Sequence, residues 1–597
     1  MNEEHTSLSI GQALKSMLPK GTASYLDDEG ETNSNINSKI DDIDLPWREP
    51  PIWPTDLFAA TAHLIHSSGL LNYFEPDPDY SRNASANPIC FTITAEERAV
   101  CVNAGLQWST VPEVPRVVYR LWKKLISAWD LKLRASTYSQ LNKRRKSPDW
   151  WGITLQLLII ADEASVGLGA PPSAEYPERW LVDVFQQIYA QPFRTDNQLK
   201  VGAYRADRQP ITFGFESDAD IGCVQPKNRI ASVGCNMRNL SRNLAYVSHA
   251  GSVRCHWQQP IYSALSEDSA TLDVLIIPLP FNVPDSSIAP SNVLPDPEKR
   301  PNWGNFEIKQ VWLEDEEKIF NIAINEINKA KKYLKNNNVN AVIFPEYSLT
   351  EDCFSRICDH LKRIEPQLEF AICGSSSNCD GEAGNFVLTA LWYDEGLSAS
   401  AGDNKYLLTS RRKHHRWKLS GEQVKDYGLE SILPPETAWW ETHMIAQREL
   451  HFFHFRQTSV FTSMICEDLA RSDPCHDILR SVGPNLLFAL LMDGPQIKHR
   501  WPARYASTLA EDPGTAVLTI TSMGLIARSN DTDRYPDKST SIALWRDDTG
   551  DVKELELEQG CQSVILTLKA DLVQDQTLDG RLNPHARSWR YESHKSL

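Results

Sequence analysis

The second half of the chain contains a series of short apolar runs in which hydrophobic residues follow one another without a break. A strand that faces water on one side alternates apolar and polar residues, so an unbroken run predicts a strand covered on both faces. Such runs occupy residues 272–281, 341–344, 368–373, 459–465, 486–492 and 515–521. Residues 315–335 have the three- and four-residue apolar spacing of an amphipathic helix. Residues 270–597 are therefore expected to form a layered α/β domain.

The residues before 270 give a different picture, in three parts. Residues 1–48 are rich in Asp, Glu, Asn and Ser, and we expect them to form a disordered acidic arm. Residues 49–200 are rich in tryptophan and are expected to be mainly helical, with no predicted role. Residues 201–269 mix short apolar pieces with polar ones and receive no assignment. Asp162 and Glu163 close the apolar stretch of one predicted helix, and we expect them on its solvated end.

Composition excludes several classes of function. The 61 basic and 78 acidic side chains give a net charge of −17, which argues against a general nucleic-acid or anionic-membrane binder. Twelve cysteines in 597 residues are too few for a disulfide scaffold, and no Cys-x-x-Cys pair indicates a metal site. No apolar run approaches the roughly 20 residues that a membrane-spanning helix needs. No secretory signal is visible, so we expect a cytoplasmic protein.

Three polar residues that suit nucleophilic catalysis stand at or beyond the ends of predicted strands. Glu346 follows the run 341–344, Cys466 follows the run 459–465, and Lys413 lies between them after a further candidate strand. Strand ends are where α/β sheets place reactive side chains. A cysteine beside a carboxylate base and an ammonium group can act as a thiolate nucleophile of low pKa. The carboxylate can abstract a proton, and the ammonium can stabilise an oxyanion.

At these residues the sequence resembles the carbon–nitrogen hydrolase (nitrilase) superfamily, from about residue 270 to 585. The superfamily's first motif, an apolar strand running into Pro-Glu, matches Glu346. Its second, a lysine followed by a later glutamate, matches Lys413 with Glu422. Its third, a strand ending in cysteine, matches Cys466 with Asp468. The resemblance implies a four-layer αββα sandwich with a Glu-Lys-Cys triad.

Two positions in this pattern stay open. Lys418 lies close behind Lys413 and competes for the role of the triad lysine. Glu430 and Glu441 compete with Glu422 for the role of the supporting glutamate. Glu467 stands where many members of the superfamily have an aromatic residue, so the substrate pocket is expected to be unusual.

The resemblance implies hydrolysis of a small non-peptide amide, or of a nitrile, through a thioester on Cys466. Glu346 would be the general base, and Lys413 and the backbone N–H of Glu467 would stabilise the oxyanion. No metal or cofactor is implied, and a homo-oligomer is expected. Two alternatives remain: a partner-controlled or catalytically silent module of a defence or signalling protein, and a soluble acyltransferase. Nothing in residues 1–269 decides between them.

Overall fold

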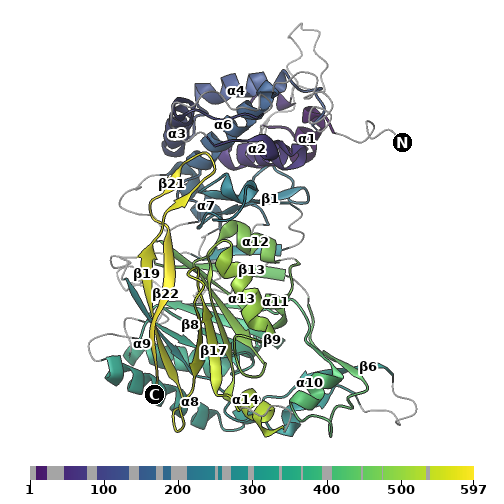
Figure 1. Cartoon of the computed structure of the whole chain (residues 1–597), viewed down its shortest axis with the longest axis vertical. Coiled ribbons are helices and arrows are strands. Elements are labelled where there is room, and N and C mark those ends of the chain that lie inside the picture. Colours follow the sequence, from purple (N-terminus) through teal and green to yellow (C-terminus); the bar gives the residue numbers. More distant parts are fainter. Residues whose placement is uncertain are drawn as a thin grey trace, which may run out of the picture.

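The computed structural model describes most of the chain as helices at the N-terminal end and sheets beyond them (Figure 1). The described residues are 8–22, 46–76, 90–133, 147–169, 179–189, 211–248, 253–258, 270–292, 301–334, 339–364, 368–392, 406–445, 448–456, 458–473, 475–532 and 538–597. No helix in these ranges combines the length and the apolar character needed to cross a membrane.

The N-terminal helices pack around one central helix, α6 (Asp149–Ala164), which is buried along most of its length. Its neighbours are α2 (Pro54–Ser68), α3 (Ala95–Thr110) and α4 (Arg116–Ile126), and α7 (Trp180–Tyr189) follows it in the chain. Trp108, Trp122 and Trp151 are fully buried among them. The tryptophans of this region therefore fill the core of the helical unit.

Part of the predicted acidic arm is a helix, α1 (Ile10–Met17). Ile10, Leu14 and Met17 are fully buried in the helical core. A capping box starts the helix, because the Ser9 hydroxyl accepts from the Gln12 backbone N–H and the Gln12 side chain accepts from the Ser9 N–H. The three- and four-residue spacing of these apolar residues outweighs the acidic composition around them. Residues 1–7 and 23–45 of the predicted arm lie outside the described residues.

The segment left unassigned by the sequence supplies strands. β1 (Gly222–Pro226) and β2 (Leu244–Ser248) form a two-stranded antiparallel sheet. β3 (Val253–Gln258) pairs in parallel with β13 (Arg448–Arg456), at the edge of a large sheet. That sheet therefore takes one of its strands from before residue 270.

The first large sheet has seven strands in the order β10–β9–β8–β7–β4–β19–β22. Val274 and Ile276 of β4 face a core shared with the second sheet, whereas Leu275 and Ile277 face the core under α8 (Glu316–Leu334) and α9 (Glu351–Ile364). Both faces are covered, which explains the unbroken apolar run. The strands span Tyr406–Arg412, Ala383–Trp392, Phe370–Ser377, Ala341–Ile343, Thr271–Ile276, Val564–Leu572 and Arg587–Ser596.

The second large sheet has the order β18–β17–β16–β15–β14–β13–β3, and its core includes side chains of α12 (Cys475–Val482) and α13 (Trp501–Glu511). The two sheets meet face to face, because Phe370 of β8 lies 4.3 Å from the ring of Phe461 and 5.7 Å from that of Phe488. The strands not yet bounded are Val552–Glu556, Ser541–Arg546, Ala516–Thr521, Leu486–Leu491 and Ser459–Ile465.

A small four-stranded sheet lies beside the large ones, at the end of the molecule far from the helical unit (Figure 1). Its order is β11 (Lys418–Leu419), β12 (Ala438–Glu441), β6 (Trp303–Ile308) and β5 (Ile288–Pro290), and α10 (Gly421–Asp426) follows β11. Phe306 and Trp439 are buried on one face, whereas Trp303 and Trp440 are exposed on the other.

The helical unit is tied to the rest of the chain through a buried ionic cluster at Asp162 and Glu163. Both carboxylates are fully buried, so the expectation that they lie on a solvated helix end is wrong. Arg581, between β20 (Asp575–Gln576) and β21 (Leu582–Asn583), lies 2.7 Å from Asp162, 2.6 Å from Glu163 and 2.8 Å from Asp579. Arg581 lies more than 400 positions away from both carboxylates in the sequence, which no local pattern could indicate.

Candidate active site

Glu346 is held at the end of β7 by close backbone packing. It follows the strand after Phe344 and Pro345, and its side chain is buried. A Cβ on Gly374 of the neighbouring strand would lie 2.3 Å from the Cα of Glu346, so only glycine fits there. Tyr347 continues the chain with a positive φ of 56°. The turn after β7 therefore depends on a glycine in β8.

Cys466 stands where β14 turns sharply into the short helix α11 (Glu467–Ala470). Its φ of 40° and ψ of −106° lie in a region that non-glycine residues rarely adopt, at a cost of about 1–3 kcal/mol. The Cys466 N–H donates to the Leu490 carbonyl at 2.8 Å, which anchors this turn to β15. The side chain is 3% exposed. Strain of this kind at a buried cysteine is typical of a functional site.

Lys413 lies between two buried carboxylates. Its Nζ donates to Glu346 Oε1 at 2.9 Å and to Glu441 Oε2 at 2.7 Å. All three side chains are at most 2% exposed. Lys418 is exposed on β11, with its ammonium 5.3 Å from the centre of the Trp440 ring. Of the two candidate lysines, the structure brings Lys413 to Glu346.

The glutamate beside Lys413 is Glu441, at the end of β12, and not Glu422. Glu422 is exposed in the first turn of α10, and Glu430 is exposed as well. Glu441 is the last residue of β12, which pairs in parallel with β6. Its carboxylate accepts a hydrogen bond from Lys413, which directly follows β10. The motif match favours Glu422, but that residue belongs to α10 and its side chain is exposed.

Two residues absent from the sequence prediction complete the arrangement. Asn385 Nδ2 donates to both Glu346 Oε1, at 2.7 Å, and Glu441 Oε1, at 2.8 Å. The Tyr347 hydroxyl donates to Glu441 Oε1 at 3.0 Å. The available signal for Asn385 was an amide residue inside the mostly apolar strand β9, whose other polar residue is Thr389.

Asp468 joins the loop that carries Lys413 to the turn that carries Cys466. Its carboxylate accepts from the backbone N–H groups of His414, at 2.9 Å, and His415, at 3.0 Å. The buried Arg411 donates to it at 3.3 Å and to the Ser463 carbonyl at 3.1 Å. We assign Asp468 a positioning effect, because it contacts the backbone directly after Lys413.

The electrostatics of the site fix where its protons reside. Burial raises the pKa of the Cys466 thiol well above its usual value, and the Glu346 carboxylate raises it further, whereas Lys413 opposes this. Burial also raises the pKa of Glu346, against the pull of Lys413. Burial would raise the pKa of Glu441 too, but the Lys413 ammonium outweighs it and lowers that pKa to about 2. The resting site thus contains a protonated thiol, which differs from the expected thiolate of low pKa.

Lys413 keeps its charge in this setting. Burial by itself would lower its pKa, but the carboxylates of Glu346 and Glu441 outweigh that effect and raise the pKa well above its usual value. A charged ammonium that interacts electrostatically with Cys466 is the kind of group that stabilises a developing oxyanion.

Several buried polar atoms around these residues have no hydrogen-bond partner among the described residues. They are Glu346 Oε2, Asn385 Oδ1 and both ring nitrogens of His443, whose Nδ1 lies 3.8 Å from Glu441. Buried polar groups are normally paired. Acceptors and donors left open in this way mark a place where a polar ligand can bind.

Glu467, the residue after Cys466, forms an ion pair on α11. Its carboxylate pairs with Arg471 at the end of α11, and the two side chains are partly exposed. Among the described residues, no group of three or more His, Cys, Asp or Glu side chains is placed to hold a metal ion.

Comparison with known proteins finds likeness in structure only. No protein-family profile matches the chain, and no curated protein matches it. A glutamine-dependent NAD⁺ synthetase from Acinetobacter baumannii is 14% identical with a TM-score of 0.28, over 50% of this chain and 45% of that one. This chain therefore spans less than half the length of that synthetase.

Two further solved structures illustrate the same likeness. Nit3 of Saccharomyces cerevisiae, a member of branch 10 of the nitrilase superfamily, is 11% identical with a TM-score of 0.29, over 50% of this chain and 90% of that one. An amidase from Nesterenkonia sp. AN1 is 9% identical with a TM-score of 0.30, over 51% and 92%. Each of these two structures is matched over about half of this chain.

Proposed function

We propose that the chain is a carbon–nitrogen hydrolase that cleaves a small non-peptide amide through a thioester on Cys466. The observation that carries this proposal is the buried Lys413 between two carboxylates, which interacts electrostatically with Cys466 in a strained strand-to-helix turn. In this proposal the two large sheets and their outer helices form the αββα sandwich of the nitrilase superfamily. Structural ion pairs alone do not require a strained cysteine beside them.

In the proposed reaction, Glu346 accepts the thiol proton while Cys466 attacks the amide carbon. Concerted transfer suits a thiol of raised pKa, because a free thiolate would add a third negative charge beside Glu346 and Glu441. The Lys413 ammonium stabilises the tetrahedral oxyanion. The backbone N–H of Glu467 adds to this, since it lies in the first turn of α11, where N–H groups have no acceptor within the helix.

The second half of the reaction uses the same groups in reverse. The amine or ammonia leaves with the proton that Glu346 received, and Glu346 then activates the water that hydrolyses the thioester. Glu441 and Asn385 hold the Lys413 ammonium and the Glu346 carboxylate in place throughout. This role of Glu441 replaces the one expected for Glu422.

The test is capture of the acyl-enzyme. The chain would be incubated with a panel of short aliphatic and aryl amides, with ammonia release and intact mass measured together. We expect an acyl adduct on Cys466, lost in Cys466→Ala and kept in Cys358→Ala, which removes a buried thiol from the core under α9. Turnover retained by Cys466→Ala would refute the proposal.

The acyltransferase alternative is tested with the same adduct, by adding a primary amine and measuring amide formation against hydrolysis. The partner-controlled alternative predicts no adduct across the panel. The described helical unit lies at the opposite end of the molecule from α10 and β6, so it gives no support to a site closed by that unit (Figure 1).

A further inference from the structure

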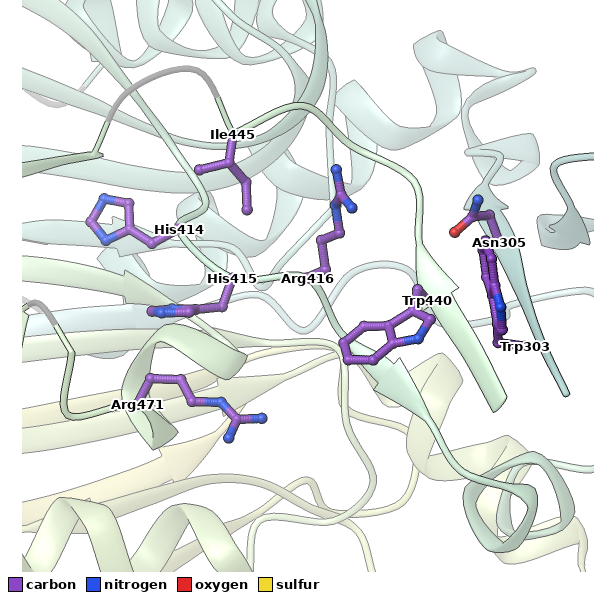
Figure 2. A pocket seen from close by; sticks show the side chains of 8 residues that line it. All are labelled: Trp303, Asn305, His414, His415, Arg416, Trp440, Ile445 and Arg471. Atoms are coloured by element: carbon purple, nitrogen blue, oxygen red, sulfur yellow. The ribbon is translucent and has the colours of Figure 1, made fainter. Parts of the chain in front are cut away.

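A hollow of about 630 Å³ opens on the exposed face of the small sheet (Figure 2). Its walls differ in chemistry. The indoles of Trp440 and Trp303 lie on one side, and the side chains of His415 and Arg471 lie on the other, with Arg416 between them. The volume is in the range of small-molecule sites.

The hollow and the candidate active site share elements but use opposite faces of them. Trp440 is exposed and Glu441, the next residue of β12, is buried, because successive strand residues point to opposite faces. Trp440 pairs directly with Asn305 of β6, and Trp303 lies two residues before it, so these three side chains share the outer face. The hollow is therefore separated from Glu441 by the backbone of β12.

The charge of the hollow is opposite to that of the chain as a whole. Its lining contains the cationic side chains of Arg416 and Arg471 and no carboxylate, in a protein of net charge −17. Arg416 Nε donates to the His443 carbonyl at 3.2 Å, which orients the guanidinium. Within the described ranges, Arg416 has no carboxylate partner. Arg471 pairs with Glu467 but remains 54% exposed.

We propose that this hollow is a second ligand site, for a small organic anion with a planar ring. The ring would stack on the Trp440 indole, and a carboxylate or phosphate on it would bind the guanidinium groups of Arg416 and Arg471, whose planar donors match such oxyanions. A nucleic-acid strand is disfavoured, because the rest of the chain is acidic. This proposal goes beyond the hydrolase assignment and does not depend on it.

Calorimetric titration with three probes separates ring from charge. The probes are 1-naphthyl phosphate, which has both, 1-naphthol, which lacks the anion, and inorganic phosphate, which lacks the ring. We expect naphthyl phosphate to bind at least about tenfold more tightly than either of the others. Repeating the titration with 1-naphthoate shows whether the site prefers phosphate or carboxylate.

Matched variants locate the binding. Arg416→Gln and Trp440→Leu are each expected to weaken naphthyl phosphate binding by about tenfold or more. Arg356→Gln, which removes an exposed arginine of α9, is the control and should leave it unchanged. Circular dichroism confirms that each variant is folded.

Three results would overturn the proposal. Binding that survives the double substitution of Arg416 and Arg471 to Gln places the ligand elsewhere. Binding lost in Cys466→Ala, or blocked by alkylation of Cys466, makes the hollow the mouth of the catalytic site. A change of oligomeric state in Trp440→Leu without loss of binding makes this face a contact between copies. Binding retained by Cys466→Ala supports a separate site, even if that variant disproves the hydrolase proposal.

Discussion

Replacing Glu441 by glutamine removes one charge from the site and changes its shape little. All four hydrogen-bond partners of this carboxylate among the described residues are donors. Oε2 accepts from Lys413 Nζ at 2.7 Å and from the Trp417 backbone N–H at 2.9 Å. Oε1 accepts from Asn385 Nδ2 at 2.8 Å and from the Tyr347 hydroxyl at 3.0 Å. A glutamine amide has one acceptor end, so it can satisfy the donors on one side only.

The expected cost follows from the better of the two orientations. With its oxygen toward Lys413, the glutamine keeps two hydrogen bonds, and its NH₂ faces Tyr347, whose hydroxyl can turn to accept, and Asn385, which cannot. Removing one partner of a buried ion pair costs about 3–5 kcal/mol. Glu346 still neutralises Lys413, so we expect the lower end, about 3 kcal/mol. If the misplaced Lys413 ammonium raises the activation free energy of acylation by a similar amount, acylation slows about 100-fold.

The comparison variant is Glu422→Gln, which changes an exposed carboxylate of α10 in the same way. Unfolding in urea, followed by circular dichroism, measures the stability of both, and intact mass measures the acylation rate. Glu422→Gln should stay within about 0.5 kcal/mol of the parent. If the two variants differ by less than about 1 kcal/mol and acylate at the same rate, the assignment of Glu441 as the supporting carboxylate is refuted.

Three further outcomes follow from the same contacts. Gly374→Ala forces a Cβ against the Glu346 backbone and should slow acylation strongly, whereas Gly152→Ala, in a helix with open space around it, should leave the rate unchanged. Burial raises the pKa of Glu346 above 4.5, so its base form is lost as the pH falls through that raised pKa. The acylation rate should therefore fall on the acid side at a pH above 4.5. A fall at pH 4.5 or below would contradict the assignment of Glu346 as the base. Arg581→Gln removes the cation that three buried carboxylates share, so the free energy of unfolding should fall by about 3–5 kcal/mol. Proteolysis between the helical unit and the sheets should become faster. Arg590→Gln, at a partly exposed arginine, should change neither.

The layered half of the fold was predictable because its signal is local. A strand with an unbroken apolar run is stable when other elements pack on both of its faces. The side chains of β4, β7 and β15 are buried in this way. β3 was missed because it is a short edge strand with mixed burial, so it lacks the continuous run of its neighbours. The helix α1 differs from the prediction for another reason. The acidic, polar composition of residues 1–48 indicates disorder, whereas the apolar spacing from Ile10 to Met17 is that of a helix.

The site was predictable only where its residues end strands. Glu346, Lys413 and Cys466 each follow a strand that the sequence indicates, and the structure brings Lys413 to Glu346 and couples both electrostatically to Cys466. Glu441 ends β12, a strand that pairs with the distant strand β6. The sequence around Lys413 does not report that pairing, so it could not favour Glu441 over Glu422 as the supporting glutamate. The raised pKa of Cys466 also depends on burial and on neighbouring charges, which a motif does not report.

The candidate site is assembled from strands of different sheets, and this explains the weight of Asp468 in it. Lys413 follows β10 of the first large sheet, whereas Cys466 follows β14 of the second. The two sheets meet through apolar side chains such as Phe370 and Phe461. Arg411, which contacts both the Ser463 carbonyl and Asp468, and Asp468, which holds the backbone after Lys413, cross that boundary with directional bonds. In the proposed reaction a displacement of about 1 Å can cost a factor of 100 in rate, so we expect these two residues to help position the Lys413 ammonium relative to the Cys466 thiol.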